Sequence, residues 1–160
     1  MALLLTAVAV TGCGQEKDPR MQPTITKQEA IDRVETLIEQ AVAQLPDAAR
    51  LESSRKEDAF PCDDHADGVP EGRAFVERDY WIRNLPKPYE PYFDTLEEYW
   101  TDRGYPQIRF DKRGLWWTMV HDPKDGFLIS LKTTGDGEQL YIRSQSPCVW
   151  PNGTPEPEAD

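Results

Sequence analysis

The sequence lacks a long hydrophobic run, a surplus of basic residues and a cluster of histidines. After residue 12, no apolar run approaches the roughly 18 residues of a membrane-spanning helix, which excludes a polytopic membrane protein. The 160 residues contain 18 Lys and Arg against 29 Asp and Glu, a formal net charge of −11. Phosphate binding needs clustered Lys and Arg, so this balance argues against a nucleic-acid partner. The length fits one domain, and the aromatic content of 10% argues against a wholly disordered chain.

The N-terminus has the pattern of a targeting signal, and the alternative is an apolar terminus with a chance cysteine. Residues 2–10, ALLLTAVAV, are apolar over the length typical of a secretory signal, and they lead into Val10-Thr11-Gly12-Cys13. This segment resembles the lipobox of bacterial lipoproteins, in which the cysteine is lipidated and the signal is cut just before it. The resemblance implies a signal peptide over residues 1–12 and a lipidated Cys13 that anchors the mature protein in the bilayer. No Lys or Arg precedes the apolar run, which departs from the pattern and predicts a translation start upstream of Met1.

The other two cysteines are consistent with export. Cys62 and Cys148 lie 86 positions apart, and in an oxidising compartment such a pair predicts one disulfide. The alternative is two unpaired buried thiols. In the chain-entropy model a loop of this length contributes about 4–5 kcal/mol, although measured values are often lower. Neither cysteine has C-x-x-C spacing, so thiol redox catalysis and zinc-finger ligation have no support.

Two segments show the spacing of an amphipathic helix. Residues 26–45 begin with Thr26 and Glu29, which form a capping box, and Pro46 ends the segment. A second helix is predicted over 90–103, with a glycine following it at the position of a helix-terminating residue. The predicted inner faces are Ile31, Val34, Ile38, Ala41 and Leu45 in the first helix, and Tyr92, Phe93, Leu96, Tyr99 and Trp100 in the second.

The remaining apolar residues alternate as in β-strands. Residues 49–57 form a weak, edge-type strand, followed by a loop over 58–72 and a strong strand over 73–84. Short turns then separate four strands that start near residues 106, 115, 127 and 140. We therefore predict an α+β fold: an open antiparallel β-sheet of about six strands, with a C-terminal four-stranded meander and two helices on one face.

The predicted domain organisation follows from these elements. Residues 13–25 form a lipidated flexible tether, because they are polar and contain two prolines. A single α+β domain spans residues 26–150. Residues 151–160 form a disordered tail by composition.

The sequence offers little support for a catalytic or metal site. The acidic loop 63–67 follows Cys62 and superficially resembles a calcium loop, but His65 and Ala74 occupy EF-hand ligand positions. A looser calcium site and a solvated acidic loop remain the alternatives there. His65 and His121 lie far apart without further ligands at zinc spacing. No nucleophile elbow, phosphate loop or dinucleotide fingerprint is present. We predict no catalytic residues, no metal and no cofactor.

The aromatic residues are the candidate binding feature. Trp116 and Trp117 are adjacent in a predicted strand, so their side chains leave opposite faces of the sheet. One of them can join the core, and the other can join an aromatic patch on the face without helices. The alternative is local packing that stabilises the sheet. The candidate binding residues are Phe75, Trp81, Trp116 and Tyr141.

A wider resemblance rests on the contexts of the two paired cysteines. The lipobox, the segment PCDD around Cys62 and the segment SPCVWPNGTPEP around Cys148 are similar to a family of small, uncharacterised lipoproteins of actinobacteria. The resemblance implies exposure on the extracytoplasmic face of the cell membrane. We predict a non-catalytic domain that binds an envelope protein or a cell-wall component. The alternatives are a structural or scaffolding envelope lipoprotein and a small hydrolase.

Overall fold

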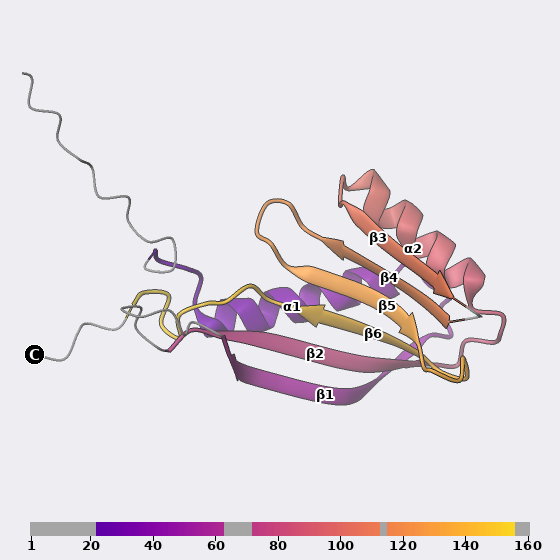
Figure 1. Cartoon of the computed structure of the whole chain (residues 1–160). Coiled ribbons are helices and arrows are strands. Elements are labelled where there is room, and N and C mark those ends of the chain that lie inside the picture. The colour runs from indigo at the N-terminus through magenta and orange to yellow at the C-terminus, as the bar shows by residue number, and fades with distance from the viewer. Residues whose placement is uncertain (1–21, 63–71, 113–114, 156–160) are drawn as a thin grey trace, which may run out of the picture.

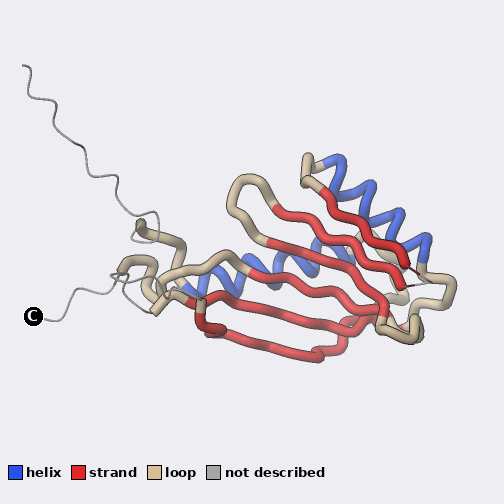
Figure 2. Tube along the Cα trace, viewed as in Figure 1, coloured by secondary structure: helices blue, strands red, loops and turns tan. Residues whose placement is uncertain are grey.

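The computed structural model describes residues 22–62, 72–112 and 115–155, with the side chains of 108–112 and 115 outside the description. Figures 1 and 2 show the described helices packed on one broad sheet. The elements follow in the order α1 (Lys27–Val42), β1 (Arg50–Pro61), β2 (Ala74–Arg83), α2 (Glu90–Asp102), β3 (Gln107–Lys112), β4 (Leu115–His121), β5 (Leu128–Thr133) and β6 (Leu140–Gln145). The predicted α+β class is therefore confirmed.

The strands form one open sheet in the order β1-β2-β6-β5-β4-β3. Every neighbouring pair is antiparallel. The last four strands pair consecutively as a meander, and β6 then pairs with β2, which places β1 and β3 at the two edges. In Figure 1 both helices lie behind the sheet, with α1 crossing β2 and β6 and α2 beside β3 and β4.

Helix α1 begins as the sequence predicts. Thr26 Oγ1 accepts the Glu29 amide at 3.2 Å, and the Glu29 carboxylate accepts the Thr26 amide at 2.8 Å. Regular helix ends at Val42, three residues earlier than expected, because the chain tightens into i→i+3 bonds before Pro46. The residues buried along the helix are Ala30, Val34, Leu37, Ile38 and Ala41.

Helix α2 covers the other half of the same face. Gly104 follows the helix with a φ of +72°, a left-handed conformation that glycine adopts without a steric penalty. Phe93, Leu96 and Trp100 are at most 1% exposed and complete the core with the residues of α1. Neither described helix is long and apolar enough to cross a membrane.

Strand β1 is longer than the sequence indicates. It continues to Pro61, whereas the composition predicts a loop from residue 58. Two register shifts, between Ser53 and Arg55 and between Glu57 and Phe60, keep it paired with β2 despite its polar sequence. The ring of Phe60 stacks on Phe75 of β2 with centroids 4.8 Å apart, which stabilises the far end of the strand. Its position at the sheet edge agrees with the prediction.

The two ends of the described chain are joined. The Thr24 amide donates to the Gly153 carbonyl, and the Trp150 amide donates to Thr24 Oγ1, both at 2.8 Å. A side chain at Gly153 would bring its Cβ within 3.1 Å of the Thr24 carbonyl oxygen, so glycine permits this close approach. The ordered domain therefore includes residues 24–25 and 151–153, which the sequence assigns to the tether and the tail.

Candidate functional site

Among the described residues, no helix lies on the second face of the sheet, which we call the helix-free face. The strand register places one cross-strand row on this face: Trp117 of β4, Lys132 of β5, Tyr141 of β6 and Trp81 of β2 are successive neighbours. Neighbouring strands lie about 4.8 Å apart, so the row spans roughly 15 Å. We call these four residues the aromatic row.

The aromatic row is held by contacts among its own members. Trp81 and Tyr141 form an edge-to-face pair with ring centroids 5.5 Å apart. Lys132 Nζ lies 4.8 Å from the centroid of the Trp117 ring, and the Arg83 guanidinium lies 5.3 Å from that of Trp81. All four side chains of the row are partly exposed. The row therefore offers solvent-accessible ring surface next to two cations, Lys132 and Arg83.

A second row, two positions from the aromatic row on each strand, consists of Met119, Ser130, Arg143 and Asp79, and a charged network extends from it to Glu77 and Arg55. Arg143 Nε and Nη2 donate to the two Asp79 carboxylate oxygens at 2.6 and 2.7 Å, and Arg143 Nη1 lies 3.3 Å from Glu77. Arg55 of β1 approaches Glu77 at 3.7 Å. Glu77 and Asp79 are only 6% and 7% exposed although neither described helix covers them. Their ion pairs compensate the cost of burying the two carboxylates.

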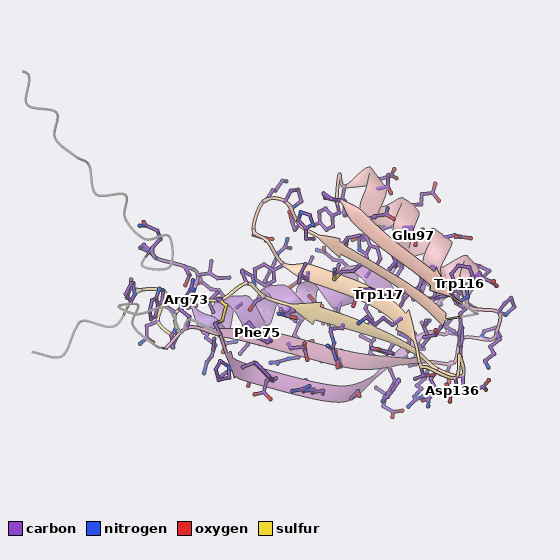
Figure 3. All side chains as sticks on the ribbon, viewed as in Figure 1. Arg73, Phe75, Glu97, Trp116, Trp117 and Asp136 are labelled. Carbon is purple, nitrogen blue, oxygen red and sulfur yellow. A yellow bond between two sulfur atoms is a disulfide. The ribbon has the colours of Figure 1, made fainter. Side chains whose placement is uncertain are left out.

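Phe75 does not join the aromatic row. It lies six positions before Trp81 on β2, about 20 Å away along an extended strand. Its ring stacks on Phe60 at the end of the sheet near Cys62, and Glu77 and Asp79 lie between it and Trp81. Figure 3 shows Phe75 and Trp117 at separate places along the sheet.

Trp116 points to the opposite face from the one expected for a binding residue. Its ring lies 5.9 Å from that of Phe93 on α2, and it packs against the hydrophobic core. The residue on the helix-free face is Trp117. Alternation along the strand shows that the two rings diverge, but only the pairing with β5 shows which ring meets the helix.

The predicted disulfide is present. Cys62 and Cys148 are bonded, with Cα atoms 6.2 Å apart. It joins the ends of β1 and β6 at the same end of the sheet as the first and last described residues, since Ala74 pairs with Val149 beside it. The lipidation candidate Cys13 lies outside the described residues.

The other candidate ligands do not form a metal site within the described part of the chain. The acidic loop 63–67, including His65, lies outside the described residues. His121 is exposed at the end of β4. No group of three or more His, Cys, Asp or Glu side chains among the described residues is arranged to hold a metal ion.

A hollow of about 110 Å³ opens on the helix-free face over the second row and reaches Lys132 of the aromatic row. Ser130, Lys132, Arg143 and Gln145 contribute its polar groups, and Met119 and Leu128 contribute apolar surface. Burial lowers the pKa of Lys132, and the neighbouring Arg143 lowers it further, while Asp79 and Glu77 act in the opposite direction. Sequence reasoning missed Lys132 and Ser130, because strand periodicity does not show which polar side chains neighbouring strands bring together.

The polar groups on the covered face have a structural role. Asp122, 3% exposed, accepts hydrogen bonds from Arg33 and from the Tyr105 hydroxyl, both at 2.7 Å, and from the Lys124 amide at 2.9 Å. Burial alone would raise the pKa of Asp122, but these hydrogen bonds and the charge of Arg33 hold it below its ordinary value. The cluster joins α1 to the turn after β4.

The helix-free face combines ring surface, a cation and a hydroxyl. Among the described residues, no serine or cysteine donates a hydrogen bond to a histidine. The fold and this face together define an α+β domain with a mixed aromatic and ionic sheet surface. No family model, curated protein or solved structure matches the chain.

Proposed function

We propose that this protein is a membrane-anchored extracytoplasmic lipoprotein whose domain binds a cell-wall component or an envelope protein without catalysing a reaction. The observation that carries the proposal is the aromatic row. Trp117, Tyr141 and Trp81 are partly exposed on one sheet face that neither described helix covers. Exposed aromatic clusters of this kind are typical of recognition surfaces.

The location in the cell envelope is supported by the cysteines. The Cys62–Cys148 bond is of a type that persists in oxidising compartments and is rare in the cytosol. The lipobox-like segment Val10–Cys13 supplies an anchor, since a diacylated cysteine carries the two chains that stable membrane attachment requires. These features support the same actinobacterial lipoprotein class that the sequence resembles.

The position of the aromatic row suits a tethered receptor. The described chain begins beside the disulfide, at one end of the sheet. Tyr141 lies near the start of β6, whereas Cys148 follows its end, so the row lies toward the opposite end. Nine residues, 13–21, connect the anchor to the domain and reach at most about 30 Å. A row at the distal end would face away from the bilayer.

The scaffolding alternative, with a partner docking on the helices, has less support. The apolar residues of α1 point into the sheet, and Ala30, Val34 and Ile38 are 0% exposed. Helix α2 buries Phe93 and Leu96 equally well. The apolar surface of these helices is therefore used within the domain.

Two experiments test the proposal. The first is an intact mass of the protein extracted from native membranes, before and after reduction. A chain that starts at acylated Cys13 and gains two mass units on reduction supports the envelope location and the disulfide. An unlipidated chain that retains Met1 and has free thiols contradicts both.

The second experiment measures binding to isolated cell wall. The lipidated full chain in detergent is sedimented with purified cell-wall sacculi, and in parallel is photo-crosslinked in intact envelopes through a probe at position 141. Trp81→Ala is expected to abolish both signals. Tyr99→Ala on α2 is the matched control and is expected to retain them. Equal signals for the two variants would exclude the aromatic row as the binding surface.

A further inference from the structure

Lys132 is the cation of the helix-free face that lacks an acidic partner in the described structure. The four carboxylates that the described residues place on this face, Glu52, Glu57, Glu77 and Asp79, each have an arginine as partner. Lys132 makes no ion pair with any described carboxylate, and its close contact is the Trp117 ring at 4.8 Å. The face thus holds a half-buried ammonium group that no described carboxylate contacts directly, although Asp79 and Glu77 act on it from a longer range.

The hollow beside Lys132 is lined by a hydroxyl that has no partner among the described residues. Ser130 is 5% exposed and lines the hollow, and its hydroxyl makes no hydrogen bond to another described residue. Buried hydroxyls are normally hydrogen-bonded, to protein or to water. The hollow of about 110 Å³ is open to solvent and admits a small acid group.

The position of this hollow next to the aromatic row restricts the ligand further. Directly opposed cross-strand neighbours have Cβ atoms about 4.5–5.5 Å apart, so Tyr141 and Trp117 flank Lys132 on either side. A ring seated on Tyr141 brings a substituent of that ring to Lys132. Sugars have an apolar face of C–H groups and polar edges, and a uronic acid adds a carboxylate at the edge.

We propose that the helix-free face binds an acidic saccharide, with the sugar ring stacked on the aromatic row and its carboxylate in the hollow, where it accepts hydrogen bonds from Lys132 Nζ and the Ser130 hydroxyl. This inference rests on the proposed binding function and specifies its ligand class. A carboxylate there gives Lys132 a direct ion-pair partner, which no described carboxylate provides. It also reverses the effect of burial and of Arg143, so the pKa of Lys132 rises on binding.

The overall charge limits the size of the ligand. The chain carries a net charge of −11, whereas the described helix-free face balances its four acidic residues with Arg55, Arg83, Lys132 and Arg143. Long polyanions are repelled by the rest of the domain, while a single acid group at Lys132 gains a short-range charged hydrogen bond. The proposal therefore applies to short saccharides with few acid groups.

The first test uses the unmodified protein. The lipidated full chain in detergent is titrated with trigalacturonic acid and with its methyl ester, and binding is followed by calorimetry and tryptophan fluorescence. Because a hydrogen bond to a charged group contributes more than one to a neutral group, the acid is expected to bind about tenfold more tightly than the ester. Equal affinity for acid and ester would overturn the carboxylate site.

Variants then assign the contact. Lys132→Met removes the charge with little loss of length and is expected to reduce acid binding about tenfold, to the level of the ester. Lys124→Met, in the exposed turn after β4, makes the same change in net charge away from the hollow and is expected to have no effect. Equal losses in both variants would overturn the assignment to Lys132. The pKa of Lys132, measured by NMR in the wild type, is expected to rise with the acid only.

Further probes distinguish this inference from the broader proposed function. If inorganic phosphate or a short Glu-containing peptide binds as tightly as trigalacturonic acid, the saccharide assignment is overturned. If no probe binds, but sacculi still sediment the wild-type protein and fail to sediment Trp81→Ala, the acidic-saccharide inference fails while the proposed function stands. If Trp81→Ala retains full sedimentation and crosslinking, the proposed function itself fails.

Discussion

The two faces of the sheet are built from alternate residues of the same strands, yet they are stabilised differently. On the covered face, Ile142 and Val76 are 0% exposed beneath α1. On the helix-free face, Glu77 and Asp79 of β2 are almost as buried, and the side chains that pack against them are arginines with which they form ion pairs. The comparison indicates that apolar burial on one face provides stability, whereas the other face can carry charge and exposed rings.

The ionic contacts on the covered face have a different structural role from those on the helix-free face, because they join the sheet to a helix. Arg78, 4% exposed, donates to Glu35 at 2.9 Å, and the Tyr80 hydroxyl donates to the same carboxylate at 2.8 Å. Asp122 similarly joins Arg33 of α1 to the end of β4. These contacts connect the sheet to the polar flanks of α1 and orient the helix. On the helix-free face the ion pairs connect strands to one another.

The largest expected effect is the loss of a core ring from the covered face. Phe93→Ala removes a fully buried side chain that packs on Trp116, and it is expected to lower the free energy of unfolding by about 3–5 kcal/mol. The measurement is urea denaturation followed by circular dichroism. Phe60→Ala, 41% exposed on the other face, is the control and is expected to cost less than about 1 kcal/mol. Equal losses would show that the two faces do not differ in this way.

Removal of the disulfide is expected to affect both faces equally. Replacing Cys62 and Cys148 together by serine releases a constraint of 86 residues and is expected to cost about 2–4 kcal/mol, the usual measured range. Urea unfolding of this double variant measures the loss. The difference between Phe93→Ala and Phe60→Ala is expected to persist in that background. A denaturation midpoint identical to that of the oxidised wild type would contradict the prediction.

A smaller effect is expected at Asp122. Asp122→Asn replaces the carboxylate that Arg33 and Tyr105 share, and it is expected to cost about 1–2 kcal/mol at pH 7. The folded pKa of Asp122 lies below the ordinary value of 3.8, so its contribution is fully present above that value. As the pH falls through 3.8 to the folded pKa, that contribution is lost.

The pH dependence provides the check on this prediction. Urea unfolding between pH 7 and pH 3 is expected to show a smaller acid-induced loss in Asp122→Asn than in the wild type. Asp102→Asn, at the exposed end of α2, serves as the control and is expected to follow the wild-type profile. An identical slope for wild type and Asp122→Asn would show that this carboxylate has no role in acid stability.

The smallest effect on stability is expected in the aromatic row. Trp81→Ala loses its edge-to-face contact with Tyr141 and part of its burial, a cost of about 1 kcal/mol. The same variant is expected to lose binding to cell wall. Urea unfolding and sedimentation with sacculi, measured on one preparation, separate the two quantities. A loss of stability as large as that of Phe93→Ala would identify Trp81 as a packing residue and remove the contrast between the faces.

Much of the fold follows from local sequence patterns. The capping box of Thr26 and Glu29 places the start of α1, because it satisfies free amides within one turn. Period-two alternation assigns the residues of β2 and β4 to the two faces. The length of β1 does not follow, because residues 58–61 become a strand only by pairing with β2.

The candidate site follows only in part. Trp81 and Tyr141 are predicted as binding candidates, and the structure brings them together. Phe75 shares their face but lies at its other end, and Trp116 faces the helix. Trp117, Ser130 and Lys132 emerge as site residues only from the register of β4, β5 and β6. Their separation along the chain contains no information about which of them lie side by side.

The sequence by itself determined the class of fold, the starts of the helices, the pairing of the two domain cysteines and the alternation of faces. These depend on interactions over a few residues, or on the presence of two cysteines in the predicted domain. The tertiary structure decided which face of β4 meets α2, how far β1 extends and which residues surround the hollow. These depend on strand order and register, which are set by packing between segments that lie far apart in the sequence.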